Sequence, residues 1–408
     1  MKVLQLSDFY PPTIGGLERH VQTLAKTLVA GGDSVTVVTL GRDDLPATES
    51  HDGVDVIRMR GWAKLLDRFY ADSKYNFHPT MPDHGLATQL ADVVERVKPD
   101  IIHAHGWIMY SALSRRVRKL APIVVTMHDY GLACVKKTGL DQSDTTCTGP
   151  GFTKCISCAS AGYGRLKGTG LSVGMSISTP LHKHVSHFAS VCGTVDRFNA
   201  AVMRDAPHSV ITSFTSSEPM DPNNLPPRPS FVPPIGDYVF FAGALGMHKG
   251  VGLLNEMYRR PDRPNVPLIV AGSPRPDAPT QWADGITVIN NVAHPDVMAA
   301  WAHCAVAVVP SQWGEPFPNT TLEAMAAGRA IVASRVGGIP DQLTSGVDGI
   351  LLEPTDIDGW TNAINDLLAR PDERKRLGDA ARTTVPQFTA ASVVPKIRAM
   401  YSDVLSRD

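Results

Sequence analysis

The sequence predicts an α/β protein of two doubly wound domains, and three observations support that prediction. Short runs of β-branched residues alternate with segments of helical periodicity, which is the pattern of βα units around a parallel sheet. The chain has 408 residues, which is too long for one ordinary core and suits two domains. Between the two halves, residues 218–237 hold seven prolines, so we expect a stiff linker there.

The expected elements follow one another as βα units in both halves. In the first half, helices are expected at 17–30, 85–97 and 108–120, and at the end of the chain residues 386–405 have the apolar spacing of an amphipathic helix. The expected strands are 3–7, 34–40, 54–59, 101–104 and 123–127, with weaker ones near 191 and 210, and then 238–242, 268–271, 286–289, 305–309, 330–333 and 350–352.

These elements give the expected domain organisation. We expect an N-terminal domain over residues 1–218, with a cysteine-rich insert at about 130–165, and a proline-rich linker over 219–236. The second domain is expected over 237–385 and a final helix over 386–408.

Composition and charge describe a globular protein without a general affinity for nucleic acid. Hydrophobic residues make up 43% of the chain, charged residues make up 19%, and the formal net charge is −1. The first apolar run meets Asp8 too early for a secretory signal, and no stretch has the apolar length of a membrane span. We therefore expect a cytoplasmic protein with no transmembrane segment. The basic residues at 115, 116, 118 and 119 indicate a solvated helix face or, as the alternative, peripheral contact with an anionic membrane.

The most informative stretch contains two glutamates, Glu315 and Glu323, with seven residues between them. Pro316 and Pro318 exclude a helix around Glu315, which must therefore lie in a loop. A helix can begin near Asn319, and the unpartnered N–H groups and positive dipole end of a helix start form an anion site. The two carboxylates and these amides could close on one ligand that carries phosphate and hydroxyls, as a nucleotide sugar does.

A simpler interpretation exists for Glu323, because with Thr320 it fits a capping box, in which the glutamate only serves its own helix start. The stretch nevertheless resembles the paired-glutamate signature of the retaining GT-B glycosyltransferases, in particular glycosyltransferase family 4 (glycosyl transferases group 1). This resemblance implies two Rossmann-like domains that face each other across a cleft, with the acceptor on the first and the nucleotide-sugar donor on the second. It also implies that the final helix crosses back to the N-terminal domain, although that helix could instead pack on the domain that it follows.

A glycine pair follows the first expected strand. Gly15 and Gly16 let backbone amides approach an anion without a Cβ in the way, although a plain tight turn would also use them. In the resembled family this loop lies over the donor diphosphate, and Glu18 then either orients the acceptor or holds the loop. No G-x-G-x-x-G follows the strand, so a dinucleotide site is not expected.

Histidines end two strands of the first half. His128 follows the strand at 123–127, where it is either a packed, hydrogen-bonded side chain or a cleft residue. The resembled family has a sugar-contacting histidine at this position, which implies a catalytic role for His128. His103 and His105 are expected to point to opposite sides of the sheet, so that one is structural, and we take His105 as the acceptor-binding residue. Tyr75 belongs to an aromatic-rich stretch that could stack on acceptor sugars or form a local hydrophobic cluster.

In the second half, Lys249 lies in a loop after the strand at 238–242. A lone lysine in such a place is ordinarily solvated. The segment 241–250 resembles the family's Gly-Arg-Leu-x-x-x-Lys-Gly loop, which implies that Lys249 neutralises the departing diphosphate. The arginine of that loop is replaced by Ala244, so His248 or an arginine of the other domain would have to supply the second cation.

The same resemblance assigns the remaining donor contacts. Main-chain groups near Val292 would hold the base, and Glu323 would hold the ribose hydroxyls. Glu315 and the amides near Phe317, Asn319 and Thr320 would hold the sugar and the diphosphate. The expected donor-binding residues are therefore Gly15, Gly16, Lys249, Val292, Phe317, Asn319, Thr320 and Glu323, and the expected catalytic residues are His128, Lys249 and Glu315.

Four cysteines mark the insert in the first domain. Cys155 and Cys158 have the tight spacing of a zinc knuckle, and clustered thiols in a cytoplasmic chain more often bind metal than form disulfides. With Cys134 and Cys147 they are expected to hold a structural zinc ion, and free thiols in a polar loop are the alternative. Four thiolates would leave no open coordination position for catalysis.

The resemblance implies a retaining hexosyltransferase that moves a sugar from a nucleotide diphosphate sugar to a hydroxyl of a sugar-containing acceptor. No metal cofactor is expected for that step. Two alternatives remain within the same architecture. One is a nucleotide-sugar epimerase, which needs no acceptor, and the other is a weakly active sugar-nucleotide binding protein, which the arginine missing at Ala244 suggests.

Overall fold

The computed structural model describes residues 1–13, 15–62 and 77–407, and the chain divides into two compact units. The first unit contains residues 1–214 and 390–408, and the second contains residues 215–389. The expected acceptor residue Tyr75 lies outside the described residues, as does most of its aromatic-rich stretch.

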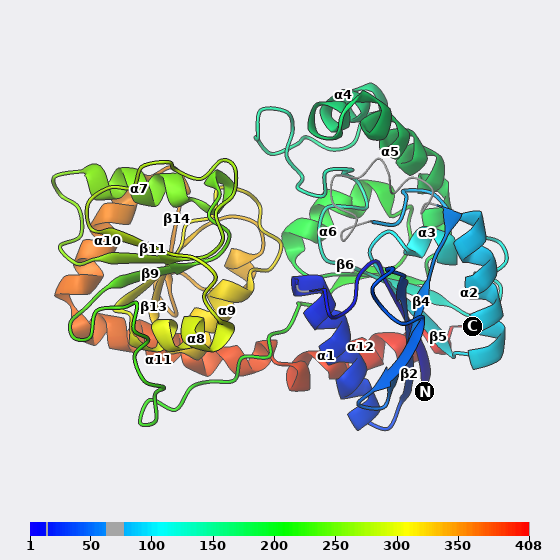
Figure 1. The fold of residues 1–408 in the computed structure, drawn as a ribbon. Coiled ribbons are helices and arrows are strands. Elements are labelled where there is room, and N and C mark those ends of the chain that lie inside the picture. Colours follow the sequence, from blue (N-terminus) through cyan, green and yellow to red (C-terminus); the bar gives the residue numbers. More distant parts are fainter. Residues whose placement is uncertain (14, 63–76, 408) are drawn as a thin grey trace. The chain divides into compact units, whose positions relative to one another are not determined.

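The first unit is built on an eight-stranded sheet in the order β3-β4-β2-β1-β5-β6-β7-β8. Figure 1 labels β2, β4, β5 and β6 of this sheet. All neighbours pair in parallel except β3 and β4, which form an antiparallel edge. The strands are β1 (Lys2–Ser7), β2 (Ser34–Leu40), β3 (Thr48–His51), β4 (Val54–Met59), β5 (Ile101–His105), β6 (Ile123–Met127), β7 (His187–Ser190) and β8 (His208–Val210).

Helices connect these strands, and one of them is shorter than the sequence predicts. A helix was expected over 108–120, but the helix ends at Ala112 and the chain continues as turns. Cations at 115, 116, 118 and 119 would repel one another in a regular helix, which favours the looser path. The helices of this part are α1 (Gly16–Ala30), α2 (His84–Val97), α3 (Met109–Ala112), α4 (Phe152–Tyr163), α5 (Arg165–Ser178) and α6 (Gly193–Asn199).

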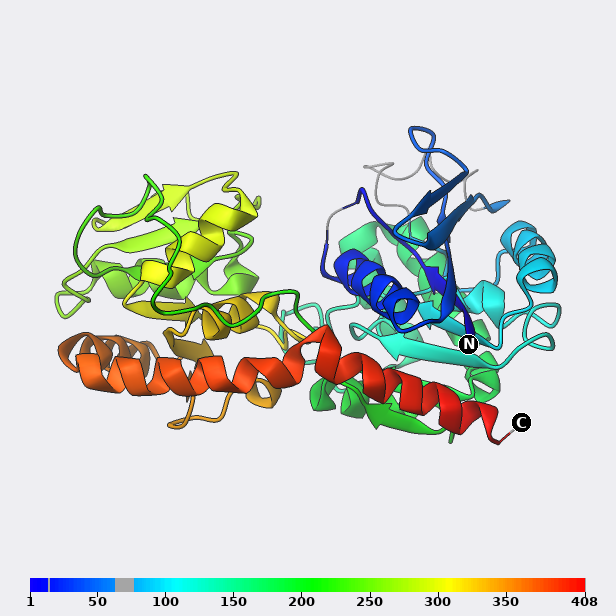
Figure 2. The same ribbon diagram turned by 90° about the horizontal axis from the view of Figure 1, so that it is seen from below.

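The C-terminal helix α12 (Ala390–Leu405) completes the core of the first unit. Figure 2 shows α12, in red, alongside α1, in blue. Val394, Ile397 and Tyr401 are buried in one cluster with Leu24 of α1 and the sheet. Because these side chains recur every three or four positions, they form a single apolar face along α12.

The second unit is built on a six-stranded parallel sheet in the order β11-β10-β9-β12-β13-β14. Its strands are apolar at consecutive positions because both faces are covered. Phe240 packs against Trp301 of α8 on one face, whereas Phe241 packs in the cluster of Trp360 of α10 on the other. The elements are β9 (Val239–Ala242), α7 (Val251–Arg259), β10 (Leu268–Ala271), β11 (Ile286–Ile289), α8 (His294–His303), β12 (Val306–Val309), α9 (Asn319–Ala326), β13 (Ala330–Ser334), β14 (Ile350–Leu352), α10 (Ile357–Ala369) and α11 (Pro371–Thr384).

The proline-rich segment 219–236, expected as a linker, packs on the second unit. Val232 is buried in the same cluster as Tyr238 and Trp301. At the start of the segment, the N–H of Met220 donates to the carbonyl of Ala326, 2.8 Å away. Apolar residues between the prolines thus give this segment enough to bury, so it behaves as part of the second unit rather than as a free spacer.

Membrane-spanning helices were not expected, and the described ranges contain no helix with the length and apolarity that crossing a bilayer requires.

Candidate active site

Each sheet has one point at which the strand order reverses. In the first unit this point lies between β1 and β5, and in the second it lies between β9 and β12. Ligands of open parallel sheets bind at such switch points, beyond the carboxyl ends of the strands. Among the described residues, Glu18 and His128 lie at the first of these places and Lys249 and Glu315 at the second, so we describe each place as the half-site of its unit.

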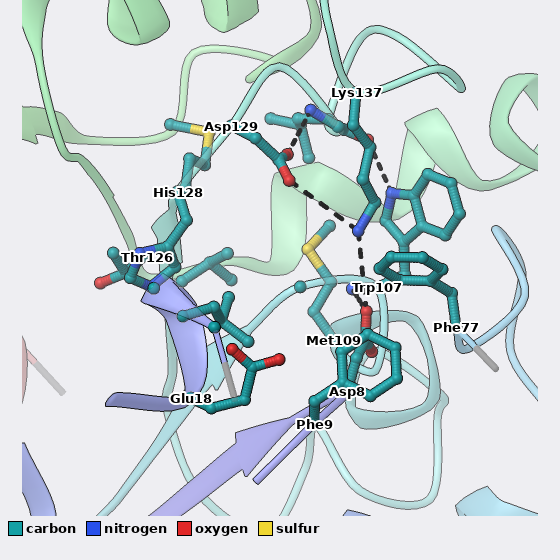
Figure 3. Close-up of a pocket in the computed structure, with 18 residues that line it drawn as sticks. Asp8, Phe9, Glu18, Phe77, Trp107, Met109, Thr126, His128, Asp129 and Lys137 are labelled. Atoms are coloured by element: carbon teal, nitrogen blue, oxygen red, sulfur yellow. Dashed lines mark hydrogen bonds and ion pairs between the residues drawn. The ribbon is translucent and has the colours of Figure 1, made fainter. Parts of the chain in front are cut away.

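The first half-site is a cavity of about 320 Å³ at the ends of β1, β5 and β6 (Figure 3). The strand register aligns Ser7 with His105 and His105 with Thr126, so the three strands end at one level. The loops that follow bring Asp8 and Trp107 to the cavity wall. The cavity is also lined by four residues that the sequence predicted for the site, namely Gly15, Gly16, Glu18 and His128.

Asp8 is the first residue after β1, and this residue is only 2% exposed. Its two oxygens accept hydrogen bonds from the backbone N–H of Ile108, at 2.7 Å, and of Trp107, at 3.0 Å. Burial nevertheless raises the pKa of Asp8 to about 6, against the opposing effect of the Lys137 charge and these N–H groups. The carboxyl therefore exchanges its proton close to neutral pH.

Lys137 supplies a positive charge on this wall. Its Nζ atom lies 3.9 Å from the carboxylates of both Asp8 and Asp129. It also lies 4.0 Å from the ring centroid of Phe77 and 4.3 Å from that of Trp107, as cation–π contacts (Figure 3). Two carboxylates and two aromatic faces therefore engage the ammonium group before any ligand arrives.

Glu18 lies in the first turn of α1 and faces the same cavity. Its carboxylate folds back toward the helix start, where a Cβ at Gly15 would collide with it. Burial raises the pKa of Glu18 above its usual value. The position is compatible with both expected roles, since the carboxylate lies against Gly15 and borders the cavity.

A cluster of histidines lies beside this cavity. The Nδ1 atom of His105 is 3.0 Å from Nε2 of His128, and only His128 lines the cavity. His105 is fully buried behind it, so any effect of His105 on a ligand passes through His128. Burial lowers the pKa of His128 to about 3 and lowers that of His105 well below its usual value, so both rings are neutral at pH 7.

The expectation that His103 and His105 face opposite sides of the sheet is wrong. Their ring centroids are 4.1 Å apart, because residues two positions apart in a strand share a face. His103 is structural, since Nδ1 lies 2.6 Å from the hydroxyl of Tyr401 and Nε2 lies 2.7 Å from that of Thr126.

Two groups of side chains could hold a metal ion. His20, His105 and His128 each offer a nitrogen atom, and these atoms lie within 4.8 Å of one another. In the described part of the chain, Nε2 of His20 and of His105 has no hydrogen-bond partner. The second group consists of Cys134, Cys147, Cys155 and Cys158, which all line a separate cavity of about 360 Å³.

The second half-site joins the loops that follow β9 and β12. Lys249 forms an ion pair with Glu315, whose carboxylate also accepts a hydrogen bond from the hydroxyl of Ser311. Glu315 lies in a loop, as its flanking prolines predicted, and it is 7% exposed. The N–H of Gln312 donates to the carbonyl of His248 at 2.8 Å, which ties the two loops together.

Gly250 makes the close approach of these loops possible. Its φ angle is +82°, in the left-handed region that glycine adopts without strain. A Cβ at this position would overlap the carbonyl of Pro310, which follows β12. Lys249 therefore reaches Glu315 because the next residue has no side chain.

Helix α9 begins at Asn319, with Pro318 as its N-cap and no side-chain cap. The capping-box interpretation of Glu323 is therefore wrong, because the helix starts two residues earlier than a Thr320 cap requires. Instead, Nε2 of His294 donates to Oε1 of Glu323 at 3.0 Å, since a carboxylate can only accept. Glu315 lies in the loop that leads into the start of α9.

The other expected donor residues are half-buried around these groups. Val292 and Phe317 pack at the edge of the core, and Asn319 and Thr320 form the first turn of α9. At Ala244, where the resembled loop has an arginine, the chain turns back toward Arg275. The N–H of Arg275 donates to the carbonyl of Leu245 at 3.1 Å.

Sequence reasoning missed Lys137, Asp129 and His294 as parts of the half-sites. Asp129 directly follows His128, so its place at a strand end was a usable signal. Lys137 had none, because its partner Asp8 is far away in the sequence and only the fold joins them.

Comparisons with known proteins give matches in both units of the chain. Residues 230–384 match the family described as Glycosyl transferases group 1, and residues 14–145 match the one described as Glycosyltransferase Family 4. The D-inositol 3-phosphate glycosyltransferase of Corynebacterium glutamicum (strain R) is 24% identical over 97% of this chain and 93% of its own length. The glycogen synthase of Mycobacterium tuberculosis is 23% identical over 94% of this chain and 89% of its own length.

Solved structures share the fold over the whole chain. Sucrose-phosphate synthase from Thermosynechococcus elongatus superposes with a TM-score of 0.72 at 18% identity, and the match covers 100% of both chains. Anabaena HepE in complex with UDP superposes with a TM-score of 0.64 at 17% identity, over 99% of this chain and 100% of HepE.

Proposed function

Because the chain is a glycosyltransferase with the GT-B fold of two Rossmann-like domains, we propose that it moves a hexosyl group from a nucleotide diphosphate sugar to a hydroxyl of a sugar-containing acceptor. The observation that carries this proposal is the second half-site. It places Lys249, Glu315 and the unpartnered start of α9 at one switch point. A cation and bare amides suit a diphosphate, and a buried carboxylate suits sugar hydroxyls.

The donor is held mainly by the second half-site in this proposal. Lys249 and the amides at Asn319 and Thr320 bind the diphosphate, and main-chain groups near Val292 bind the base. Glu323 accepts from the ribose hydroxyls, with its orientation held by His294. Gly15 and Gly16 of the first unit cover the diphosphate, as the resemblance implies. Relatives of the same fold include HepE in complex with UDP and with UDP-glucose, which supports a nucleotide-sugar donor.

We propose transfer with retention and without a metal cofactor for the chemical step. The bond from the anomeric carbon to the phosphate oxygen breaks through an oxocarbenium-like state, and a bond to the acceptor oxygen forms on the same face. The acceptor proton passes to the departing phosphate, whose charge Lys249 and the α9 amides neutralise. His128 is neutral, so it contributes a hydrogen bond to the sugar rather than a positive charge.

The first half-site then receives the acceptor, and its charges indicate the acceptor class. Asp8, Glu18 and Asp129 face one engaged cation, Lys137. Carboxylates bind hydroxyls and amines well but repel phosphate. We therefore propose an acceptor that presents hydroxyl or amino groups, and no phosphate, to this wall. The name of the relative D-inositol 3-phosphate glycosyltransferase states a phosphorylated acceptor. This chain would therefore differ from that relative in acceptor class.

Arg275 is our candidate for the cation that Ala244 lacks. Its backbone is bonded next to Ala244, at Leu245, and its charge acts on His248, whose pKa is lowered by burial and by the charges of Lys249 and Arg275. The second cation therefore comes from the neighbouring loop of the same unit.

We also propose that the protein works in the cytoplasm, because no disulfide joins the cysteines of the described residues and thiols persist in a reducing compartment. The basic residues after α3 leave peripheral contact with an anionic membrane as a further proposal.

The test is a panel of nucleotide diphosphate sugars with and without sugar acceptors, followed by release of the nucleotide. Acceptor-dependent release supports transfer. Isomerisation of the donor without acceptor would establish the epimerase, and binding without turnover would establish a sugar-nucleotide binding protein.

Variants of the two glutamates test the assignment of the second half-site. Glu323→Gln should weaken donor binding about tenfold, because one charge-assisted hydrogen bond becomes neutral. Glu315→Ala should lower turnover more than affinity. The matched control is Glu353→Gln, whose carboxylate is exposed at the surface and should leave both values unchanged. If calorimetry and kinetics show the Glu315 and Glu323 variants equal to the control, the assignment fails.

A further inference from the structure

The cysteine-rich insert is ordered with very little apolar burial of its own. Residues 141–151 include no buried side chain. Helix α4, which follows them, buries Ala159 alone among its residues and leaves Phe152 exposed at 58%. A segment of this kind needs another source of stability, which small protein modules commonly obtain from disulfides or a metal. In the described chain the four cysteines of the insert form no disulfide, so disulfides do not supply it.

Three short elements bring the four cysteines of the insert to one cavity. Cys134 closes a turn, since its N–H donates to the carbonyl of Tyr130 at 2.8 Å. A tight hairpin follows, with a bridge between Leu140 and Thr146, and Cys147 stands at its end. Cys155 and Cys158 lie in the first turns of α4, three residues apart and therefore on one side of the helix. All four line the cavity of about 360 Å³.

Burial raises the pKa of Cys134 and Cys158, and polar groups around the sulfur atoms of the insert act in the opposite direction. Backbone N–H groups of residues 136–139 donate to the sulfur of Cys134. The N–H of Gly151 donates to the sulfur of Cys155 at 3.4 Å, and the charge of Lys136 acts on Cys158. N–H donors and nearby cations stabilise negative sulfur, and the same donors commonly surround thiolates that bind metals.

We propose that Cys134, Cys147, Cys155 and Cys158 bind one Zn²⁺ ion as a structural site. Four thiolates at about 2.3 Å form the closed tetrahedral set of structural zinc. In the described residues, no three of these sulfur atoms lie within 4.8 Å of one another, whereas three histidine nitrogens do. Binding therefore draws the exposed segment 141–151 and the start of α4 together around the ion, with release of the thiol protons.

The site bears on the acceptor half-site through one short connection. Lys137 follows Cys134 by three residues, and its N–H donates to the carbonyl of Cys134 at 2.9 Å. Fixing Cys134 on an ion therefore fixes the turn that holds the Lys137 ammonium between Asp8 and Asp129. This consequence rests on the proposed function, whereas zinc binding itself does not.

Metal content of the full-length protein tests the proposal directly. Protein purified after expression with added zinc should contain about one Zn²⁺ per chain by elemental analysis. Cys155→Ala and Cys158→Ala should each lose most of that zinc. Cys304→Ala, a buried cysteine of the second unit, is the matched control and should keep it. His128→Gln should keep it as well, because the histidine cluster is the other group able to hold an ion.

A second measurement does not depend on variants that fold. Replacing zinc by Co²⁺ in the wild-type protein should give the intense ultraviolet sulfur-to-cobalt charge-transfer band of thiolate ligands, together with visible bands of tetrahedral cobalt. Absence of bound metal with all thiols reactive would overturn the proposal, and so would disulfides found by thiol counting in denaturant. Zinc that is retained in the Cys155 variant and lost in the His128 variant would place the ion at the histidines instead. Each of these results is obtained without the transferase assay, so failure of the zinc site and failure of the proposed function are distinguishable.

Discussion

Replacing Tyr401 by phenylalanine should destabilise the first unit by about 2 kcal/mol through one buried hydrogen bond. Tyr401 lies on α12 and its hydroxyl is 2.6 Å from Nδ1 of His103 on β5. Both residues are fully buried. Nε2 of His103 is already bonded to the hydroxyl of Thr126. Loss of the Tyr401 hydroxyl should therefore leave Nδ1 unsatisfied.

The expected size follows from what the substitution removes and what it keeps. Phenylalanine keeps the ring, so the packing of α12 on the core is unchanged. The loss is one hydrogen bond, together with a buried nitrogen left unsatisfied, which costs about 1–3 kcal/mol. In a unit of this size, that change corresponds to a fall in Tm of roughly 4–8 °C.

Tyr110→Phe is the matched control. Tyr110 is also fully buried and also faces a histidine, His182, but the distance from its hydroxyl to Nε2 is 3.5 Å. At that distance the hydrogen bond is weak, so its loss should cost less than about 1 kcal/mol. Urea unfolding followed by a signal of the first unit measures both variants. If both variants lose the same free energy of unfolding, the length of the hydrogen bond does not determine its contribution to stability. The reasoning on Tyr401 would then be refuted.

Two further predictions concern pH and a glycine. Burial lowers the pKa of His103 and His128 to about 3, so the folded state binds fewer protons than the unfolded one and loses stability as pH falls below 6.5. At pH 5 each of these two histidines should lower the free energy of unfolding by about 2 kcal/mol. Asp8, with its raised pKa of about 6, should increase it by about 1 kcal/mol. The urea concentration at the unfolding midpoint should therefore fall between pH 7 and pH 5. A midpoint that stays constant would show these rings to be charged or exposed. Gly250→Ala should push the Lys249 loop away from β12 and weaken binding of a nucleoside diphosphate at least about tenfold, measured by calorimetry. Gly252→Ala, whose Cβ meets only the flexible end of a methionine, should bind as the wild type does, and equal affinities for both variants would refute the role of the close approach.

The sequence contained enough to predict the two sheets and the loop around Glu315. Strand positions followed from apolar runs, and the prolines at 316 and 318 correctly excluded a helix before Asn319. These predictions succeed because each depends on neighbouring residues only. Backbone preference and side-chain periodicity are local properties, and local properties can be read from a sequence.

Predictions that depended on distant partners were less complete. Residues two apart in a strand share a face, which places His103 and His105 together, but only the fold shows that Tyr401 and His128 are their partners. The proline-rich segment was expected to be a stiff linker because it holds seven prolines. Its few apolar residues nevertheless find a core to enter, and Val232 is buried there. Burial of that kind depends on the tertiary neighbours and leaves no local signature.

The two half-sites use their charges differently, and this difference separates the ligands that they suit. Lys249 has one carboxylate partner, Glu315, which is itself held by Ser311, so a diphosphate can compete for the lysine while Glu315 turns to sugar hydroxyls. Lys137 is shared between two carboxylates and two aromatic rings, so a phosphate that approached it would meet Asp8 and would gain little.

Under the proposed function, anion recognition therefore belongs to the second half-site and polyol recognition to the first. Trp107 lines the first cavity, and its fluorescence can report occupancy without turnover. A methyl glycoside or an amino sugar should change this signal at concentrations where the corresponding sugar phosphate does not. Tighter binding of the sugar phosphate would mean that Lys137 leaves its carboxylates for the ligand, and the division of charge between the half-sites would be wrong.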